Sequence, residues 1–241
     1  CGVCTGEIKN VISSPLLETE RTLISESFLS KKSKSDIQYR YRVFYVRTDI
    51  QRFISHLDWM RMLFRLVSKA PLETVFTQGF SPHPKISLCP PLPLGVESIC
   101  EYFDISFYSP YTQEDIINAL SLENIPGYKI NKAERLIIKP RVPFAEWISI
   151  KIPQEYISHI ESSLSTFEKE VSHPFIKIKE NKTTTYDLKK IILKTYGKNH
   201  QLFILKSLES PALYDMLAEL LRLDKTILYT LSLCRIGWSF L

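Results

Sequence analysis

The chain has 241 residues, which allows one large or two small domains, and its 44% hydrophobic and 24% charged residues predict a globular protein with a buried core. Five cysteines in a chain of this length argue against a disulfide-stabilised secreted scaffold and favour a reducing, cytoplasmic location. No apolar run reaches the ~20 residues that a membrane-spanning helix needs, and the start lacks the pattern of a signal peptide, so we expect no membrane partner.

Positive charge is concentrated in one segment of the chain. The net charge is +5 at pH 7, and residues 31–65 hold nine Lys or Arg against three Asp, a net charge of +6 for that segment alone. Such a cluster favours a phosphate-bearing partner such as RNA. A solvated linker followed by the charged face of a helix would give the same pattern, so both interpretations stay open.

Residues 1–38 lack a sustained hydrophobic period and end in a stretch rich in Ser and Lys, which predicts a tail and linker. Because the chain begins with Cys1 and not with Met, we expect it to be a piece of a longer protein. Cys1 and Cys4 form a CxxC pair, which supplies half of a four-thiolate metal site. We therefore assign these two residues to a partial metal site whose other ligands lie outside this chain.

Regular structure is predicted from residue 39 onward. Alternating aromatic and β-branched residues predict a strand over 39–47. A helix is expected to begin at Ser55, because a serine followed three residues later by Asp58 is typical of a capping box. Spacings of three and four predict one buried helix face, made of Phe53, Leu57, Met60, Leu63, Phe64 and Val67. The next predicted elements are strands at 72–76, 85–89, 101–108 and 128–138 and a helix at 112–122, with a second capping box at Thr112 and Asp115.

The second part of the chain repeats this order. Strands are predicted at 147–153, 175–180, 185–196, 201–208 and 227–240, and helices at 154–171 and 210–223, the latter with Ser210 as N-cap and Pro211 at the first helical position. A strand, a helix, two or three strands, a helix and a strand are typical of the split βαβ pattern. The predicted fold class is therefore α+β, with two tandem ferredoxin-like (split βαβ) domains with antiparallel sheets, at residues 39–143 and 144–241.

Residues 78–98, QGFSPHPKISLCPPLPLGVES, hold five of the fourteen prolines and two of the seven glycines. Proline rings restrict their own φ and the residue before them, so the stretch predicts a rigid loop and not a flexible connector. Pro82 and Pro84 flank His83, which leaves its imidazole little conformational freedom to lose on binding. We expect the apolar residues of the loop to pack on its own domain. The polar side chains expected to share one groove are His56, Arg61, His83, Lys85 and Glu97.

Candidate substrate-binding residues come from the basic segment, the first helix and the loop. They are Arg47, Ser55, His56, Asp58, Arg61, Arg65, Gln78, Ser81, His83, Lys85 and Glu97. His56 and His83 are also candidates for catalytic proton transfer, because imidazole changes its charge near neutral pH. For His56 the alternative is a histidine satisfied within the core. The sequence contains no phosphate-binding glycine loop, GxSxG elbow, HExxH or CxxxCxxC motif, which argues against the corresponding classes.

Three motifs in fixed order, SHLD at 55–58, GFSPHP at 79–84 and LPLGVES at 92–98, together with the opening CGVC, resemble a bacterial family. It is the radical-SAM-associated domain of unknown function, which is fused behind, or encoded beside, cobalamin-binding radical SAM proteins. The resemblance spans about residues 40–240. It implies a radical SAM protein as fused or separate partner, which would hold the 4Fe-4S cluster, S-adenosylmethionine and cobalamin, and no cofactor in this chain. The ending CRIGWSF departs from the usual arginine pair of the family and leaves the role of Arg235 open.

The sequence leaves three functions open. The first is a non-catalytic module that recognises or presents RNA, or another phosphate-bearing substrate, for a radical SAM enzyme. The second is a metal-independent endoribonuclease that uses His56 and His83, since CRISPR repeat-processing endoribonucleases also combine tandem ferredoxin-like domains with histidine chemistry. The third is a structural domain that docks the radical SAM protein. Cleavage of RNA distinguishes the second from the first.

Overall fold

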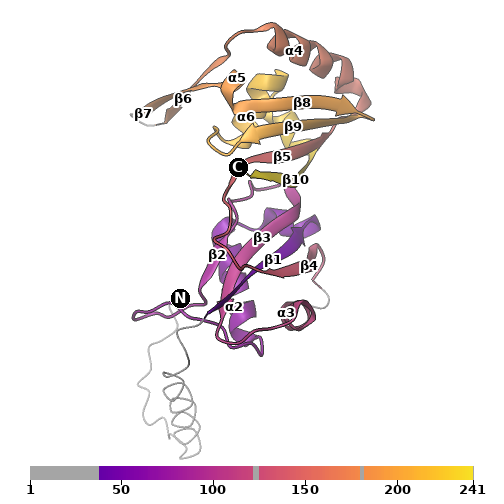
Figure 1. Ribbon diagram of the computed structural model, residues 1–241. Coiled ribbons are helices and arrows are strands. Elements are labelled where there is room, and N and C mark those ends of the chain that lie inside the picture. Colours follow the sequence, from indigo (N-terminus) through magenta and orange to yellow (C-terminus); the bar gives the residue numbers. More distant parts are fainter. Residues whose placement is uncertain (1–37, 122–124, 180–181, 241) are drawn as a thin grey trace, which may run out of the picture. The chain divides into compact units, whose positions relative to one another are not determined.

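One large and one small β-sheet organise the residues that the structure describes. The computed structural model describes residues 38–121, 125–179 and 182–240 (Figure 1). The large sheet has eight strands and is mostly antiparallel, and the small sheet has two strands. The fold class is α+β, as the sequence predicted. The partial metal site predicted at Cys1 and Cys4 lies outside the described residues.

The first half, residues 39–135, supplies four strands of the large sheet. The strands are β1 (Tyr39–Arg47), β2 (Ile86–Leu88), β3 (Glu97–Phe107) and β4 (Tyr128–Arg135). The helices are the 3₁₀-helix η1 (Asp49–Phe53), α2 (His56–Lys69) and α3 (Gln113–Leu120). The strands lie in the order β4-β1-β3-β2, and each neighbouring pair is antiparallel.

The second half, residues 143–240, has the corresponding strand order. Its strands in the large sheet are β5 (Pro143–Lys151), β8 (Ile192–Lys198), β9 (Gln201–Ser207) and β10 (Ser232–Phe240). Its helices are the 3₁₀-helix η2 (Gln154–Tyr156), α4 (Ile157–Lys169), α5 (Leu188–Ile191), α6 (Leu213–Leu221) and α7 (Lys225–Thr230). The strands lie in the order β10-β5-β9-β8, again with antiparallel neighbours. A hairpin of β6 (Pro174–Lys179) and β7 (Lys182–Asp187), inserted between α4 and α5, forms the small sheet.

The two halves share one sheet because β3 pairs in parallel with β10. The contact is short, with Cys234 opposite Glu97 and Arg235 opposite Ser98. Further along the same edge of β3, its residues 103–105 pair with β2. The sequence predicted two antiparallel sheets, and the structure joins them through this parallel pair. Local alternation of apolar residues could not reveal the pairing, because it carries no information about distant partner strands.

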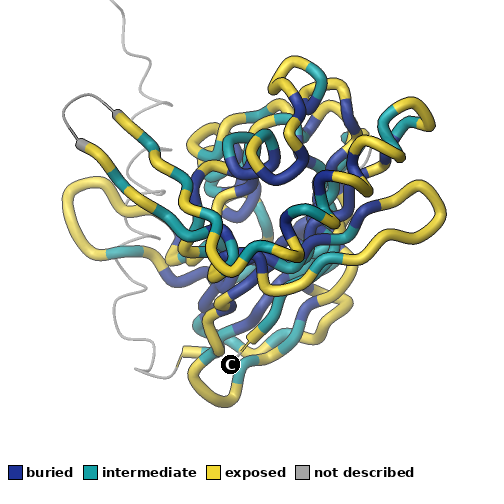
Figure 2. The backbone as a smooth tube through the Cα atoms, turned by 90° about the horizontal axis from the view of Figure 1, so that it is seen from above, coloured by how far each residue is buried: buried dark blue, intermediate teal, exposed yellow. Residues whose placement is uncertain are grey.

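Helices α2 and α3 pack on one face of the first-half strands. Alternation along β1 and β3 turns every second side chain toward this face. The buried side chains of this core are Tyr41, Val43, Tyr45, Trp59, Leu63, Leu66, Val67, Phe103, Ile105, Phe107, Ile116, Leu120, Tyr128, Ile130 and Ala133. Both caps predicted for the first half are confirmed: the Ser55 hydroxyl oxygen accepts the Asp58 N–H at 3.2 Å, and Thr112 with Asp115 forms a reciprocal capping box. Buried segments lie in the interior, and exposed loops and hairpins surround them (Figure 2).

The buried face of α2 differs from the predicted one. Phe53 and Leu57 are 57% and 59% exposed, whereas Trp59 and Leu66 are buried. The reason is the indole of Trp59, which stacks on the Tyr45 ring with centres 5.6 Å apart and donates from Nε1 to the Tyr45 hydroxyl at 2.8 Å. Burial of this large ring decides how the helix is rotated about its axis. The predicted face was chosen from residue spacings alone and did not include Trp59.

The proline-rich stretch connects the two cores. Leu92 and Val96 are 6% and 0% exposed and belong to the hydrophobic core of the second half. Leu94 between them is 59% exposed, and its carbonyl oxygen accepts the Tyr214 hydroxyl at 3.4 Å. The sequence predicted that this stretch packs on its own domain. Its second part instead crosses to the other half, where strand pairing between β3 and β10 brings that core within reach.

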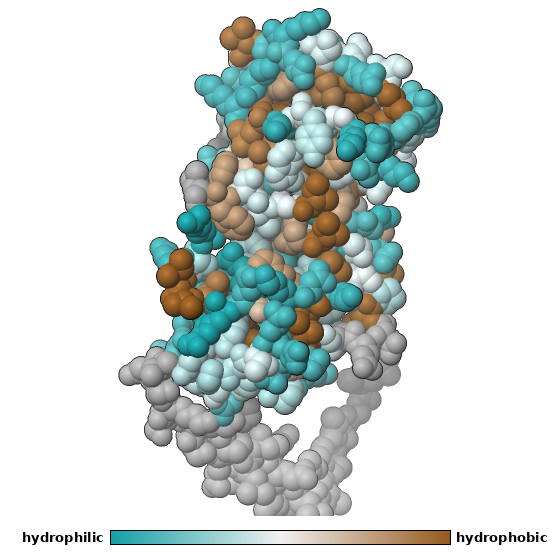
Figure 3. Space-filling model, turned by 45° about the vertical axis from the view of Figure 1, so that its right-hand side comes forward, coloured by the Kyte–Doolittle hydropathy of each residue, from teal (hydrophilic) through white to brown (hydrophobic). Residues whose placement is uncertain are grey.

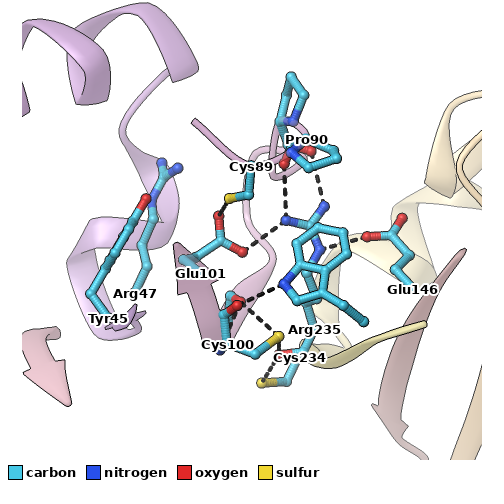
Figure 4. A network of polar contacts seen from close by, with 12 residues as sticks. Tyr45, Arg47, Cys89, Pro90, Cys100, Glu101, Glu146, Cys234 and Arg235 are labelled. Atoms are coloured by element: carbon cyan, nitrogen blue, oxygen red, sulfur yellow. Dashed lines mark hydrogen bonds and ion pairs between the residues drawn. The ribbon is translucent and has the colours of Figure 1, made fainter. Parts of the chain in front are cut away.

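A buried ion network holds this junction together (Figure 4). Arg235 of β10 is 1% exposed, and its guanidinium donates to Glu146 of β5 at 2.5 Å and to Glu101 of β3 at 2.8 Å. It also donates to the carbonyl oxygens of Pro90 and Pro91 at 3.2 and 3.0 Å. Burial alone would lower the pKa of Arg235, but the two carboxylates outweigh it and raise the pKa above its ordinary value. Arg235 therefore stays charged and joins three strands to the proline-rich stretch.

Three predicted elements of the second half differ from the structure. The strand predicted at 185–196 is divided into the end of β7, helix α5 and most of β8. Helix α6 begins at Leu213, without a side-chain cap, and the hydroxyl of Ser210 accepts a hydrogen bond from Lys206 Nζ at 2.9 Å. Part of the strand predicted at 227–240 is instead helix α7. Asp224 caps that helix by accepting the Thr226 N–H at 2.8 Å, a local bond that overrides the β-propensity of the apolar residues after it.

Gly127 lies where the backbone leaves no space for a side chain. Its φ is +76°, and a Cβ there would lie 2.1 Å from the carbonyl oxygen of Thr48. We expect Gly127→Ala to lower the free energy of unfolding by about 2–4 kcal/mol in urea denaturation. Gly197→Ala is the matched control, because its nearest neighbour would be 3.9 Å away, and it should change the free energy by less than about 1 kcal/mol. Similar losses for the two variants would contradict the expectation.

Removal of the Arg235 charge should destabilise the protein strongly. Arg235→Met leaves Glu101 buried without its cation and Glu146 with Lys206 as its one cation, and we expect a loss of about 3–5 kcal/mol in the free energy of unfolding. Arg61→Met is the control: it breaks the exposed ion pair with Asp58, 3.0 Å long, and should cost less than about 1 kcal/mol. A loss for Arg235→Met as small as that of the control would show that the network does not hold the halves together.

Candidate functional site

A groove lined by cationic side chains lies on the first half. A hollow of ≈ 590 Å³ is bounded by α2, by β2 and the turn after it, by one face of β1 and β3, and by the segment that leads into β5. An adjoining hollow of ≈ 310 Å³ shares Arg40, Ile86, Ser87 and Asp104 with it, and we call the two together the basic groove. Its lining residues are Gln38, Arg40, Arg42, His56, Met60, Phe64, 85–91, Tyr102, Asp104, Ser106 and 139–143.

The lining of the basic groove carries an excess of positive charge. Its cationic residues are Arg40, Arg42, Lys85, Lys139 and Arg141, and among the described lining residues Asp104 is the one acid. Lys85, Lys139 and Arg141 are exposed and therefore accessible to a ligand. On the face drawn in Figure 3, hydrophilic residues gather over the first half beside hydrophobic ones. A concave, partly apolar surface concentrates such a field and attracts anions, phosphate groups among them.

Strand geometry sets two of these arginines side by side. Arg40 and Arg42 are two residues apart on β1 and share a face, and the cross-strand neighbour of Arg42 is Asp104. Arg42 Nε donates to Asp104 Oδ1 at 2.8 Å, and Arg40 Nη2 donates to Oδ2 at 3.2 Å. Burial alone would lower the pKa of Arg42, but the bond and charge of Asp104 raise it above its ordinary value. Arg42 is fixed in the wall, whereas the side chain of Arg40 is 42% exposed and open to a ligand.

The residues before β2 form a hairpin at the edge of the groove. The Thr77 N–H donates to the carbonyl oxygen of His83 at 2.8 Å, and the Thr77 hydroxyl accepts the His83 N–H at 3.2 Å. Gly79 in the turn has a φ of +132°, a conformation that L side chains rarely adopt. Phe80 beside it is fully exposed. The first part of the proline-rich stretch is therefore an ordered, exposed hairpin, and the second part is the buried connection to the other core.

His56 lines the basic groove, whereas His83 is not part of its lining and stacks on the lining residue Phe64. His56, Met60 and Phe64 follow one another at intervals of four on α2, so they share a helix face that lines the groove. His83 stacks on Phe64, with ring centres 4.8 Å apart and the ring planes inclined by 13°. Its Nδ1 lies 3.2 Å from the carbonyl oxygen of Pro84 and must carry the hydrogen, because a carbonyl only accepts.

Three predicted site residues form the cap of α2 and lie outside the lining of the groove. The Ser55 hydroxyl donates to Asp58 Oδ2 at 2.7 Å, and Arg61 Nη1 donates to Asp58 Oδ1 at 3.0 Å. All three are exposed, and the carboxylate of Asp58 is the hydrogen-bond partner of the other two. Gln78 and Ser81 are exposed in the hairpin turn, where a ligand that extends beyond the groove would meet them.

The other predicted site residues lie elsewhere. Arg47 is 2% exposed, and its guanidinium donates to backbone carbonyl oxygens of η1 and its C-cap and lies 4.7 Å from the ring centre of Trp59. Burial lowers the pKa of Arg47. Glu97 accepts from Arg52 at 3.3 Å and from the Asp49 N–H at 3.1 Å. Arg65 lines a separate small hollow at the end of α2. The predicted grouping of Arg61 and Glu97 with the two histidines is therefore not present in the lining of the groove.

Four cationic residues of the groove were not among the site residues predicted from the sequence. Arg40 and Arg42 were counted in the basic segment, but their alternation along the strand over 39–47, which puts both on one face, was not used. Lys139 and Arg141 flank a proline in the connection between the halves, and no local pattern ties them to the groove. The sequence also contained a signal for the burial of Arg235, because alternation along its strand places it on the same buried face as Leu233.

The second half has a hollow of its own, whose lining differs in charge from that of the basic groove. A hollow of ≈ 650 Å³ in the second half has Glu161 and Glu168 beside Lys198 and His200 in its lining, so it lacks an excess of positive charge. Among the described residues, no group of three or more His, Cys, Asp or Glu could hold a metal ion. Within 38–121, 125–179 and 182–240, no helix is long and apolar enough to cross a membrane.

Comparisons with known proteins give a family but no function. Residues 40–217 match a family described as an uncharacterized protein conserved in bacteria (DUF2344). A comparison with curated proteins found no match. The match covers most of both halves and includes every lining residue of the groove except Gln38.

The two arginines beside Asp104 should differ in their contribution to stability. Arg42→Met removes the buried partner of a carboxylate that is 5% exposed, and we expect it to lower the free energy of unfolding by about 2–4 kcal/mol. Arg40→Met removes the more exposed partner of the same carboxylate and should cost less than about 1 kcal/mol. Denaturant unfolding of both variants tests this assignment. A larger loss for Arg40→Met would mean that the wall of the groove depends on Arg40 and that Arg40 is not free for a ligand.

Proposed function

The chain belongs to the bacterial family of uncharacterized conserved proteins DUF2344, and from the site of this member we propose that it is an RNA-binding module whose basic groove holds the sugar–phosphate backbone. The observation that carries the proposal is the lining of the groove. Five cationic residues surround one acid, and that acid is already paired with Arg40 and Arg42. Phosphates are the ligands that such a surface binds, and RNA supplies them in a row.

The rigidity of the groove supports recognition of a large ligand. Buried Arg42 fixes one wall, and the carbonyl oxygens of Pro90 and Pro91 are bound to Arg235 at the end of another. Exposed side chains, Lys139 and Arg141 among them, then provide charge on a frame that does not have to be ordered on binding.

We also propose that the two halves are tandem ferredoxin-like units. In the first half β1 lies between β4 and β3, and β2 is at the edge. In the second half β5 lies between β10 and β9, and β8 is at the edge. Within each half, all neighbouring strands are antiparallel. The β6–β7 hairpin and α7 are then insertions in the second unit. The fold is compatible with RNA recognition but does not by itself establish it.

The partner in this proposal is a radical SAM enzyme, fused or separate, to which the module would present RNA. The support is the resemblance of the SHLD, GFSPHP and LPLGVES motifs to radical-SAM-associated domains. The chemistry, with the iron–sulfur cluster, S-adenosylmethionine and cobalamin, would belong to that enzyme. A docking role without RNA stays the alternative.

Salt dependence of RNA affinity tests the proposed function. The chain is titrated into a fluorescein-labelled RNA with a stem and single-stranded tails, and anisotropy is recorded over a series of salt concentrations. If the four accessible cations of the groove (Arg40, Lys85, Lys139 and Arg141) each contact a phosphate of a single-stranded region, the slope of log K against log salt is negative, with a magnitude of at most about 3. The triple variant Lys85→Ala, Lys139→Ala, Arg141→Ala should bind at least about tenfold more weakly, with a slope smaller in magnitude by about 2.

The matched control removes the same charge elsewhere. Lys129, Lys151 and Lys169 are exposed and lie outside the groove lining, so their triple alanine variant should keep the affinity and slope of the unchanged protein. An affinity that does not change with salt, or an equal loss in both triple variants, would contradict the proposal. Cleavage of RNA by His56 and His83 stays a prediction, and a denaturing gel of the same samples tests it.

A further inference from the structure

The imidazole of His83 has one covered face and one open face. It stacks on Phe64 almost in parallel, and the residue as a whole is exposed. Among the described aromatic rings, Phe64 is the one in ring contact with His83. A flat ring that is backed by a second ring and open to solvent on the other side can extend a stack by one more planar group.

The position of this ring is fixed before any ligand arrives. Pro82 and Pro84 restrict the backbone on both sides, and two hydrogen bonds with Thr77 hold the main chain of His83. The side chain is held too, because Nδ1 donates to the Pro84 carbonyl oxygen at 3.2 Å. Stacking on such a ring loses little conformational entropy, whereas a mobile exposed side chain would have to be ordered first.

The His83 ring lies beside the basic groove. Phe64, which backs the imidazole, is itself part of the groove lining, and Lys85, two residues after His83, lines the adjoining hollow. A ligand that uses both features needs phosphates for the groove and a planar group for the ring. Nucleotides combine the two, and only bases that are not stacked within a duplex are free to leave their neighbours for a protein ring.

We propose that His83 is a nucleobase-stacking residue and that the ligand of the basic groove is single-stranded, with an unpaired base on the open face of His83. The inference rests on the proposed RNA-binding function and adds the class of RNA. Base stacking on a protein ring tolerates any base, because every base has a π-face, so the site should select strandedness more than sequence.

Affinities for three oligonucleotides test this inference. Anisotropy is measured for a short single-stranded RNA, for an abasic RNA of the same length, and for the blunt duplex of the same sequence. The unchanged protein should prefer the single strand to both others. His83→Ala should weaken binding of the single strand by roughly 5- to 150-fold and leave the abasic RNA unaffected, so that the preference disappears.

Two further variants separate stacking from other effects. His83→Phe keeps a flat ring and should retain the preference for the single strand, which a contact through an imidazole nitrogen would not explain. His200→Ala removes an exposed histidine of the second half and should change no affinity. Unfolding midpoints like that of the unchanged protein should accompany all three variants, because His83 and His200 are exposed.

The outcomes distinguish this inference from the proposed function. If the unchanged protein binds abasic RNA or duplex as tightly as the single strand, or if His83→Ala binds the single strand unchanged, the stacking role is wrong while phosphate binding in the groove stands. Loss of the preference in His83→Phe would also overturn stacking, in favour of a polar contact. If none of the three RNAs binds, both the inference and the proposed function are wrong.

Discussion

Arg235 is the residue on which the arrangement of the two halves depends. A guanidinium that is 1% exposed has no water to bond, so its donors need protein acceptors. Glu101 comes from β3, Glu146 from β5, and two backbone carbonyl oxygens come from the proline-rich stretch. No single strand or loop provides this set. The charge is satisfied only when strands of both halves and the stretch between β2 and β3 meet at one point. The network therefore favours this packing of the two halves over arrangements that would leave the charge unpaired.

The same network holds two walls of the basic groove in place. One wall ends at Pro90 and Pro91, which Arg235 binds directly. The segment 139–143 forms another wall and runs into β5, the strand that carries Glu146. Two walls that lie far apart in sequence are therefore tied to one buried cation, and the exposed charges on them keep a fixed spacing. A structural element that looks remote from any ligand thus determines how the ligand-binding surface is presented.

The sequence predicted what local chemistry decides. The caps at Ser55 and Thr112, the α+β class and the order of most elements follow from short-range patterns. Long-range packing decided the rest: the Trp59–Tyr45 stack rotated α2, and the parallel β3–β10 pair merged two sheets into one. For the site, His56 and Lys85 do line the groove, but burial of Arg47 could not be read from its charge, because a buried and an exposed arginine look the same in a sequence.

Cross-linking tests most directly whether the basic groove is the surface that holds RNA. A photoreactive single-stranded RNA is irradiated in complex with the full chain, and cross-linked peptides are identified by mass spectrometry. We expect cross-links in the segments 77–91 and 139–143, which carry the hairpin and two walls of the groove. Cross-links confined to the second half, around α4 and β9, would contradict it.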